Sequence, residues 1–395
     1  MRSFKISRIS TFMLLSLFAI FSVTSCASGT KPFGVIFTRE DSNEHLDIYK
    51  ILDNAQGKIE QLTFTPTIGE FIHSASPDGT VIVFLTERYG ASDNTPSDLA
   101  IERPRAAYML DTVTKELTDI TAVVDDDYRI IAYDFSMDWS PDQKQFMVVK
   151  SQKVDDKLEI FLKFMDYEGK NRKEVSVPIA GDLSAFQSAK WSPDGRKILL
   201  VQLPIGVEAE SANPDWALLV YEVESKNIKQ LTSYADDCAQ EKWSPNSQQI
   251  VVSCSKKPLN SGMPDTSGSE TIRIFNIENP GQTYGYGGFN SCYHPSWSPN
   301  GKKIVFVCEK MPKQTGIFIF NADGSGFREV NLGNAASLII FRNPTWSPDG
   351  TQIVYVAGAG NYQTQIYSIN LDGSNQVMLT KEEASYRVIS VYPVP

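Results

Sequence analysis

The residues whose type and spacing most clearly indicate a chemical reaction are four cysteines in the second half of the chain: Cys238, Cys254, Cys292 and Cys308. The members of each pair are 16 residues apart, and the pairs are centred on two Ser-Pro-Asn turns, at Asn246 and Asn300. If a hairpin folds at each turn, the paired cysteines lie directly opposite each other, at the separation that a disulfide needs. We therefore predict the disulfides Cys238–Cys254 and Cys292–Cys308. Free buried thiols and a metal site are the alternatives, and the absence of any Cys-x-x-Cys pair argues against zinc.

The motifs of common catalytic sites are missing from the sequence. It has neither the Gly-x-Ser-x-Gly elbow of serine hydrolases nor a glycine-rich phosphate loop. Its three histidines, His45, His73 and His294, are too few for a histidine-rich metal site. The chain carries 37 Lys and Arg against 47 Asp and Glu, a net charge of -10, so a nucleic-acid backbone would repel it. We predict no catalytic residues and no nucleic-acid partner.

The amino terminus carries the signals of an exported protein. Three basic residues among the first eight precede the apolar run 12–23, which is shorter than the roughly 20 residues of a membrane-spanning helix. The run ends in Val-Thr-Ser-Cys, which resembles a bacterial lipobox with Cys26 as the lipid-modified residue. We predict a lipoprotein signal peptide at 1–25, acyl chains such as palmitate on Cys26, and a short tether at 26–33. The alternative is an ordinary signal peptide with an incidental cysteine.

A short signature recurs six times and indicates the strands and turns in which these residues lie. It reads Ser-Pro-Asp-Gly or a close variant and begins at Ser76, Ser140, Ser192, Ser244, Ser298 and Ser347. A Trp precedes every copy but the first, and the serines are 49 to 64 residues apart. In such a turn Ser accepts hydrogen bonds from turn amides, Pro presets φ, and Asp-Gly supplies a left-handed residue. One short strand leads into each turn and about three follow it, and four antiparallel strands per roughly 50 residues is the period of a β-propeller blade.

The two ends of the chain complete the blade count. Residues 35–63 offer strands two to four of a blade that lacks its first strand, and the tail 386–392 offers one lone strand. Pairing the tail with the amino-terminal blade would close the ring and remove its open sheet edges. We therefore predict an all-β fold, with a single propeller domain over 34–395 and seven four-stranded blades. A ring of six blades with irregularly packed ends is the alternative.

The repeated Trp-Ser-Pro-Asp-Gly, followed by Ile-Val-Phe and a closing Leu-Thr, resembles the TolB-type (WD40-like) propeller repeat over nearly all of residues 34–395. The resemblance implies the fold but says little about function, because propellers host many activities. TolB proteins carry an amino-terminal α/β domain and are soluble in the periplasm. Here no such segment fits between Cys26 and Gly34, and the chain carries a lipobox-like motif. A role in the Tol-Pal system is therefore not transferred to this protein.

The loops opposite the signature turns form the candidate binding surface. They are long and varied, and variable loops on one face of a rigid scaffold commonly carry binding. Tolerated surface insertion is the alternative explanation. On that face, the starts of the innermost strands should ring the mouth of the central channel. The candidate binding residues there are Tyr133, Asp134, Asp236, Asp237, Asn290, Tyr293, Arg342 and Arg387.

These features together predict a lipid-anchored, periplasm-facing propeller of the cell envelope that acts as a non-catalytic binding scaffold. The expected partner is an envelope protein or a cell-wall or surface glycan, and the protein is expected to be monomeric. The alternative is a metal-dependent carbohydrate-active enzyme similar to oligogalacturonate lyases, related propellers with a metal site in the channel. No cofactor is predicted, and a channel metal is left open. In a Gram-negative envelope, Ala27 after the cysteine favours the outer membrane over the inner one.

Overall fold

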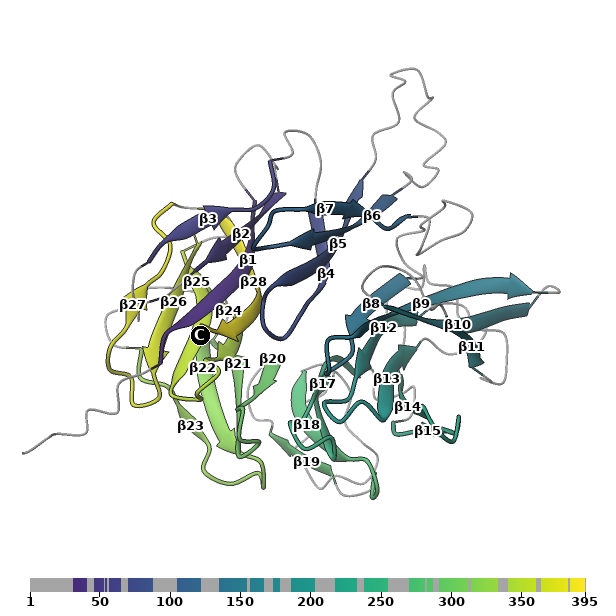
Figure 1. Cartoon of the computed structure of the whole chain (residues 1–395). Helices are drawn as coiled ribbons and strands as arrows, with labels where there is room; N and C mark the ends of the chain where they lie inside the picture. Colours follow the sequence, from purple (N-terminus) through teal and green to yellow (C-terminus); the bar gives the residue numbers. More distant parts are fainter. Residues whose placement is uncertain are drawn as a thin grey trace, which may run out of the picture. The chain divides into compact units, whose positions relative to one another are not determined.

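Seven antiparallel four-stranded sheets, arranged as a β-propeller, form the described part of a computed structural model of the chain (Figure 1). The all-β fold and the seven blades predicted from the repeat are confirmed, and the six-bladed alternative is wrong. The model describes residues 31–394 except 41–45, 53, 55–56, 65–69, 88–104, 122–134, 155–156, 167–172, 178–185, 203–216, 233–237, 255–269, 281–282, 287–290, 312–313, 333–339, 360–363 and 383. The described residues belong to one unit, Lys31–Pro395.

Each blade contributes one strand to each of four positions, counted outward from the first strand. The first strands are β28 (Ser385–Pro393), β4 (Glu70–Ala75), β8 (Phe135–Trp139), β12 (Phe186–Trp191), β16 (Cys238–Trp243), β20 (Cys292–Trp297) and β24 (Ile340–Trp346). The second strands are β1 (Phe33–Glu40), β5 (Val81–Glu87), β9 (Gln145–Val154), β13 (Lys197–Gln202), β17 (Gln249–Cys254), β21 (Lys303–Met311) and β25 (Gln352–Gly358). The third strands are β2 (Leu46–Ile51), β6 (Arg105–Asp111), β10 (Lys157–Asp166), β14 (Ala217–Glu222), β18 (Thr271–Asn276), β22 (Gln314–Asn321) and β26 (Thr364–Asn370). The short fourth strands are β3 (Ile59–Gln61), β7 (Leu117–Asp119), β11 (Lys173–Val177), β15 (Ile228–Gln230), β19 (Thr283–Tyr286), β23 (Arg328–Glu329) and β27 (Val377–Met378).

The signature turns join the first and second strands by the predicted chemistry. In all six copies the serine Oγ donates to the side-chain oxygen of the Asp or Asn two residues on, at 2.6–2.9 Å. The same Oγ accepts from the backbone N–H five residues on, at 2.9–3.0 Å. The fourth residue is left-handed in every copy, with φ between 59° and 70°, even where it is Gln143 or Ser247. The turn geometry therefore holds without glycine, because the serine and the acid or amide fix it from both sides.

The Trp of the signature fastens one blade to the preceding one. Three indole N–H groups donate, each at 3.1 Å, to a backbone oxygen two residues before the preceding signature serine: Trp243 to Lys190, Trp297 to Lys242 and Trp346 to Ser296. The indole rings also pack into the apolar layers between neighbouring blades, where they meet second- and third-strand side chains. The Trp is therefore an architectural residue, and each such bond adds on the order of 1 kcal/mol of stability.

The closing Leu-Thr completes the outer edge of a blade. In four blades the threonine Oγ1 accepts a backbone N–H of the third strand at 2.9–3.1 Å, in the pairs Thr63–Ile48, Thr121–Ala107, Thr232–Leu218 and Thr380–Ile366. The residue before each threonine donates its own N–H to the carbonyl of the same third-strand residue. The motif thereby pairs backbone groups just beyond the short fourth strand.

The predicted closure of the ring is confirmed. The carboxy-terminal strand β28 pairs antiparallel with β1, and the two lie side by side as yellow and purple arrows in Figure 1. Tyr392 of β28 is 4% exposed, and its hydroxyl donates to the Ile51 carbonyl at 3.0 Å. Its ring leaves no room for a side chain at Gly34 or Gly79, where a Cβ on the latter would lie 2.6 Å from the ring Cγ. The Lys50 ammonium lies 4.8 Å from the ring centroid.

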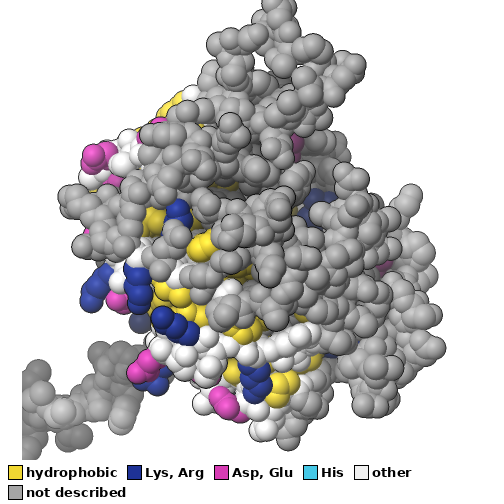
Figure 2. Space-filling view, turned by 90° about the vertical axis from the view of Figure 1, so that its right-hand side faces the viewer, with side chains coloured by type: hydrophobic (Ala, Val, Ile, Leu, Met, Phe, Trp, Pro, Cys, Tyr) yellow, Lys and Arg dark blue, Asp and Glu magenta, His cyan; other side chains and the backbone are white. Residues whose placement is uncertain are grey.

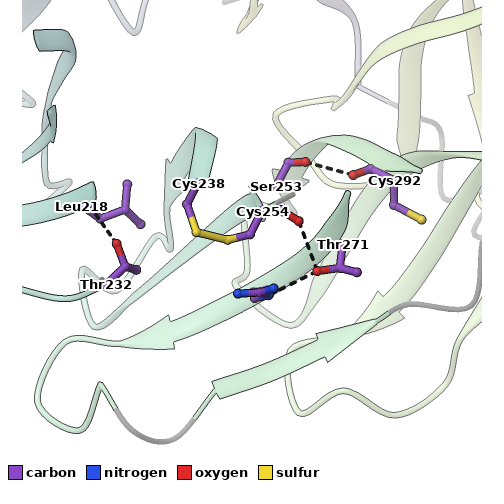
Figure 3. The surroundings of a disulfide bond; sticks show 8 residues. Leu218, Thr232, Cys238, Ser253, Cys254, Thr271 and Cys292 are labelled. Carbon is purple, nitrogen blue, oxygen red and sulfur yellow. Dashed lines mark hydrogen bonds between the residues drawn. A yellow bond between two sulfur atoms is a disulfide. The ribbon is translucent and has the colours of Figure 1, made fainter. Parts of the chain in front are cut away.

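Both predicted disulfides are present. Cys238 lies opposite Cys254 in the β16–β17 pair, and Cys292 lies opposite Cys308 in the β20–β21 pair, each with Cα atoms 4.1 Å apart. All four cysteines are buried. Figure 3 shows the first disulfide beside the Ser253 hydroxyl, which donates to the Cys292 carbonyl at 3.0 Å. The two disulfide-bearing blades are therefore also hydrogen-bonded to each other next to the bridges.

Candidate binding site in the central channel

The seven first strands surround a cavity of about 920 Å³. Residues from every one of them line it, together with Thr38, Glu40 and Leu46 from β1 and β2. This volume falls in the range of small-molecule sites, which is about 300–1,000 Å³. A closed ring of seven strands offers a rigid wall whose chemistry depends on which side chains point inward.

The residue two positions before each signature serine is one of those that line the channel. These six residues are Ser74, Asp138, Lys190, Lys242, Ser296 and Thr345. Side chains alternate between the two faces of a strand, so a fixed offset from a fixed turn selects the same face in each blade. The signature thus sets the position, and the residue at that position is free to vary in charge and size.

In three of the first strands, a bulge with a left-handed residue adds a further residue to the cavity lining. Gln240, His294 and Asn343 each lie four residues before a signature serine, line the cavity, and have φ of 58°, 55° and 47°. The strand register shifts at each of these places. The Gln240 Oε1 accepts the backbone N–H of His294 at 2.6 Å and so links two neighbouring bulges. Left-handed residues other than glycine cost on the order of 1–3 kcal/mol each and gather at functional sites.

The cavity is basic although the chain as a whole is acidic. Its charged lining residues are the four cations Lys190, Lys242, Arg342 and Arg387 and the two carboxylates Glu40 and Asp138. Four cations against two carboxylates leave an excess of two positive charges, whereas the whole chain has a net charge of -10. Low-dielectric walls around a channel concentrate such a field, so the lining favours an anionic ligand.

Asp138 is the carboxylate with the most partners in this lining. It accepts hydrogen bonds from the Ser74 hydroxyl at 3.0 Å and the Trp191 backbone N–H at 2.9 Å, and its Oδ1 lies 3.6 Å from the Lys190 ammonium. These contacts engage both carboxylate oxygens and balance the charge of Lys190. The remaining cations of the lining therefore depend on other groups for compensation.

Lys242 and Arg387 make no ion pair or hydrogen bond through their side chains with any residue that the structure describes. Lys242 lies deep among protein atoms while its side chain stays open to the channel. Burial lowers the pKa of its ammonium group, and repulsion from Lys190 and Arg387 adds to this effect against the attraction of Glu241 and Asp138. An anion beside Lys242 would stabilise the charged ammonium group against both its burial and this repulsion.

His294 stands where these charges converge. Burial, and then repulsion from Arg342, Lys242 and Arg387, lowers its pKa to about 4, so the ring is neutral at pH 7. Its Nδ1 is buried and has no hydrogen-bond partner in the part of the chain that the structure describes. The Tyr293 ring meets the imidazole edge-on, with centroids 5.0 Å apart. A buried polar atom without a partner costs about 1–3 kcal/mol, which a ligand atom could recover.

The lowered pKa of His294 predicts a loss of stability in acid. The unfolded chain binds a proton at its ordinary pKa near 6.5 and the native state only near 4, so the free energy of unfolding falls as the pH drops through this window. One proton contributes a slope of up to about 1.4 kcal/mol per pH unit. We expect His294→Gln to be less sensitive than the wild type between pH 6.5 and 4, in urea unfolding at each pH. Equal slopes for both proteins would contradict the assignment.

Three of the eight candidate residues from the sequence fall within the described structure. Arg342 and Arg387 line the cavity. Tyr293 is not among the lining residues; it is half-buried, packs against the apolar layer of the neighbouring blade, and its pKa is raised to about 12 by burial and by Glu309. The remaining candidates, Tyr133, Asp134, Asp236, Asp237 and Asn290, lie outside the described residues, as does Cys26.

Several lining residues were not predicted, because the candidates chosen from the sequence lie at the loop ends of the first strands and these residues lie farther along the strands. They include Lys190, Lys242, Gln240, His294 and Asn343. The signal that could have found them is the fixed offset of two or four residues before each signature serine. From the sequence, His294 was considered only as a possible metal ligand. Among the described residues, no three His, Cys, Asp or Glu side chains gather closely enough to hold a metal ion.

Comparisons with known proteins give the fold and no more. No protein-family model matches the sequence, and no curated protein is similar to it. A puromycin-hydrolysing peptidase of Mycobacterium tuberculosis is similar in structure, with a TM-score of 0.60 and 10% identity over 89% of this chain. The periplasmic gluconolactonase of Pseudomonas aeruginosa has a TM-score of 0.52 and 14% identity over 93% of this chain. The chain is a β-propeller.

The extent of each match differs. This chain covers all of the gluconolactonase and 53% of the peptidase, so it spans about half of the latter's length. TolB from Acinetobacter baumannii is also among the similar structures, at 14% identity and a TM-score of 0.44, with 90% of this chain and 81% of TolB covered. In the described part of the chain, no helix is long and apolar enough to span a membrane.

Proposed function

We propose that this protein is a non-catalytic binding scaffold of the cell envelope, and that its ligand enters the central channel. The observation that carries the proposal is the cavity itself: seven first strands build its wall, three bulges at Gln240, His294 and Asn343 aim extra side chains into it, and basic groups line it. Strained backbone and uncompensated charge lower stability, and a bound ligand would offset both. The partner is an envelope protein or a cell-wall or surface glycan.

An envelope location has independent support. The signal-like segment at 1–25 implies export, and disulfides such as the two buried ones form and persist in an oxidising compartment. One of the structures with this fold is described as a periplasmic gluconolactonase. We further propose that Cys26 carries the lipid that holds the propeller at the membrane, facing the periplasm.

Lipid attachment at Cys26 predicts a labelling result. In a bacterial host grown with an alkyne analogue of palmitate, the wild-type protein is expected to take up the label and to sediment with membranes. Cys26→Ser is expected to lose the label and to appear in the soluble fraction or as an uncleaved precursor. An unlabelled and soluble wild type would show an ordinary signal peptide instead, and a labelled Cys26→Ser protein would show that the lipid is attached at another residue.

The carbohydrate-active alternative is less well supported. It needs a metal site in the channel, and the described lining offers His294, Asp138 and Glu40 without gathering three ligand side chains at one point. The scaffold proposal needs only the rigid wall and the charges that are present. Metal analysis of the purified protein together with a polyuronate cleavage assay separates the two, because tightly bound metal with cleavage would establish the enzyme.

Capture from native envelopes tests the scaffold directly. The tagged wild-type protein is cross-linked in intact cells, and captured proteins and glycans are compared with those of Lys242→Ser/Arg387→Ser, which changes two channel cations. The matched control is Lys226→Ser/Lys302→Ser, which removes the same charge from two exposed turn residues. We expect the channel variant to lose the captured partner and the control to keep it. Retention by the channel variant would place binding elsewhere on the molecule.

A further inference from the structure

The charges that line the channel indicate the chemical class of the ligand, which the volume of the cavity does not. The cavity lining carries an excess of positive charge, whereas acidic and basic side chains lie mixed with apolar ones over the described atoms of the face in Figure 2. Compensation is also uneven within the cavity, because Asp138 pairs with Lys190 while Lys242 and Arg387 pair with no residue that the structure describes. If no ligand bound there, protein carboxylates paired with these two cations would make the fold more stable.

His294 lines the same cavity as these two cations. His294 lies in β20, Lys242 in β16 and Arg387 in β28, and both cations are near enough to His294 to repel its protonated form. Its Nδ1 is buried and has no hydrogen-bond partner among the described residues, and it can donate a hydrogen bond in the neutral tautomer that carries the proton there. A guanidinium, an ammonium and a neutral N–H donor together suit an oxyanion, with the guanidinium able to take both oxygens of a planar carboxylate.

We infer that the channel is a carboxylate-binding site, in which one ligand carboxylate lies beside His294 Nδ1 and is held by Lys242 and Arg387. The inference rests on the proposed function and names the ligand class of that site. An excess of two positive charges in the lining matches a ligand with two carboxylates, and the cavity of about 920 Å³ admits a small molecule or the end of a larger acidic one. Gln240 supports the site by holding the backbone N–H of His294 at 2.6 Å.

Histidine NMR tests the assignment with succinate as the probe. The chain has three histidines, so the ring signals of protein labelled in histidine can be told apart once His294→Gln removes one of them. Succinate added to the wild type at pH 7 is expected to shift the His294 signal with saturation and to leave those of His45 and His73 in place. Lys242→Ser/Arg387→Ser is expected to bind at least tenfold more weakly, and Lys226→Ser/Lys302→Ser as well as the wild type.

Each other outcome of the titration has a defined meaning. Inorganic phosphate that binds as tightly as succinate would overturn the carboxylate assignment in favour of a general oxyanion site, and neutral glycerol that shifts the same signal would overturn anion binding altogether. No saturating shift with succinate would also overturn the inference. If the double variant does not fold, Arg387→Ser alone replaces it, since this side chain is exposed and unpaired among the described residues. Envelope capture that still depends on the channel would leave the scaffold proposal standing while the ligand class fails.

Discussion

Tyr392→Ala is expected to lower the free energy of unfolding by about 3–5 kcal/mol, the range for removing a large buried aromatic side chain. The ring fills the space that Gly34 and Gly79 leave free, so its loss opens a cavity between two blades. The same change removes the hydroxyl bond to the Ile51 carbonyl and the ring over which the Lys50 ammonium lies. Because β28 is the strand that closes the propeller, the cavity lies at the seam of the ring.

Equilibrium urea unfolding measures this loss, and Tyr392→Phe is the matched control. The phenylalanine keeps the ring and loses only the hydroxyl, so a decrease of about 1 kcal/mol is expected. Gly79→Ala should also destabilise strongly, since its φ of 69° and the 2.6 Å approach to the ring both oppose a side chain. If Tyr392→Ala and Tyr392→Phe cost the same small amount, the closure depends on backbone pairing alone and the packing account is wrong.

Loss of either disulfide is expected to cost about 3 kcal/mol. Each bridge closes a loop of 16 residues, for which the entropy of the unfolded chain gives about that value. Both Cys238→Ala/Cys254→Ala and Cys292→Ala/Cys308→Ala should show the loss in urea unfolding. Treating the wild type with a reductant should reproduce the two losses together, and an unchanged midpoint after reduction would contradict a structural role.

The bridges also bear on the channel. Cys238 precedes the bulge residue Gln240 by two positions, and Cys292 precedes His294 by two, so each disulfide fixes the strand just ahead of a bulge. We therefore expect the Cys292→Ala/Cys308→Ala protein to weaken succinate binding as well as stability, at a temperature where it is still folded. Unchanged binding would mean that the bulges hold their shape without the covalent link.

The fold could be predicted from the sequence because its information is local and repeated. A turn signature that recurs six times gives the length of a blade. The turn centres at Asn246 and Asn300 show which cysteines lie opposite each other, with no knowledge of tertiary structure. Ring closure followed from counting strands at the two ends. Each of these inferences needs only hairpin geometry and the cost of an open sheet edge.

The site was harder to predict because its charges come from different blades. Asp138, Lys190 and Lys242 lie about 52 residues apart in the sequence and become neighbours only when consecutive blades pack side by side. A bulge changes the alternation of side chains ahead of it, so counting back from the turn does not give the face of a residue beyond the bulge. Tyr293 and Arg342 both lie five residues before their serines and just ahead of a bulge, yet Arg342 lines the cavity and Tyr293 packs between blades. Simple alternation cannot foresee that difference.

Photo-crosslinking inside intact cells tests whether the ligand binds in the channel. A benzophenone amino acid is placed at Thr345, which lines the cavity, and in a second protein at Lys226, an exposed turn residue. We expect illumination to join a specific envelope component to position 345 and excess succinate to suppress the product. A specific product at position 226 and none at 345 would contradict this expectation, because the ligand would then bind on the outer surface of the propeller.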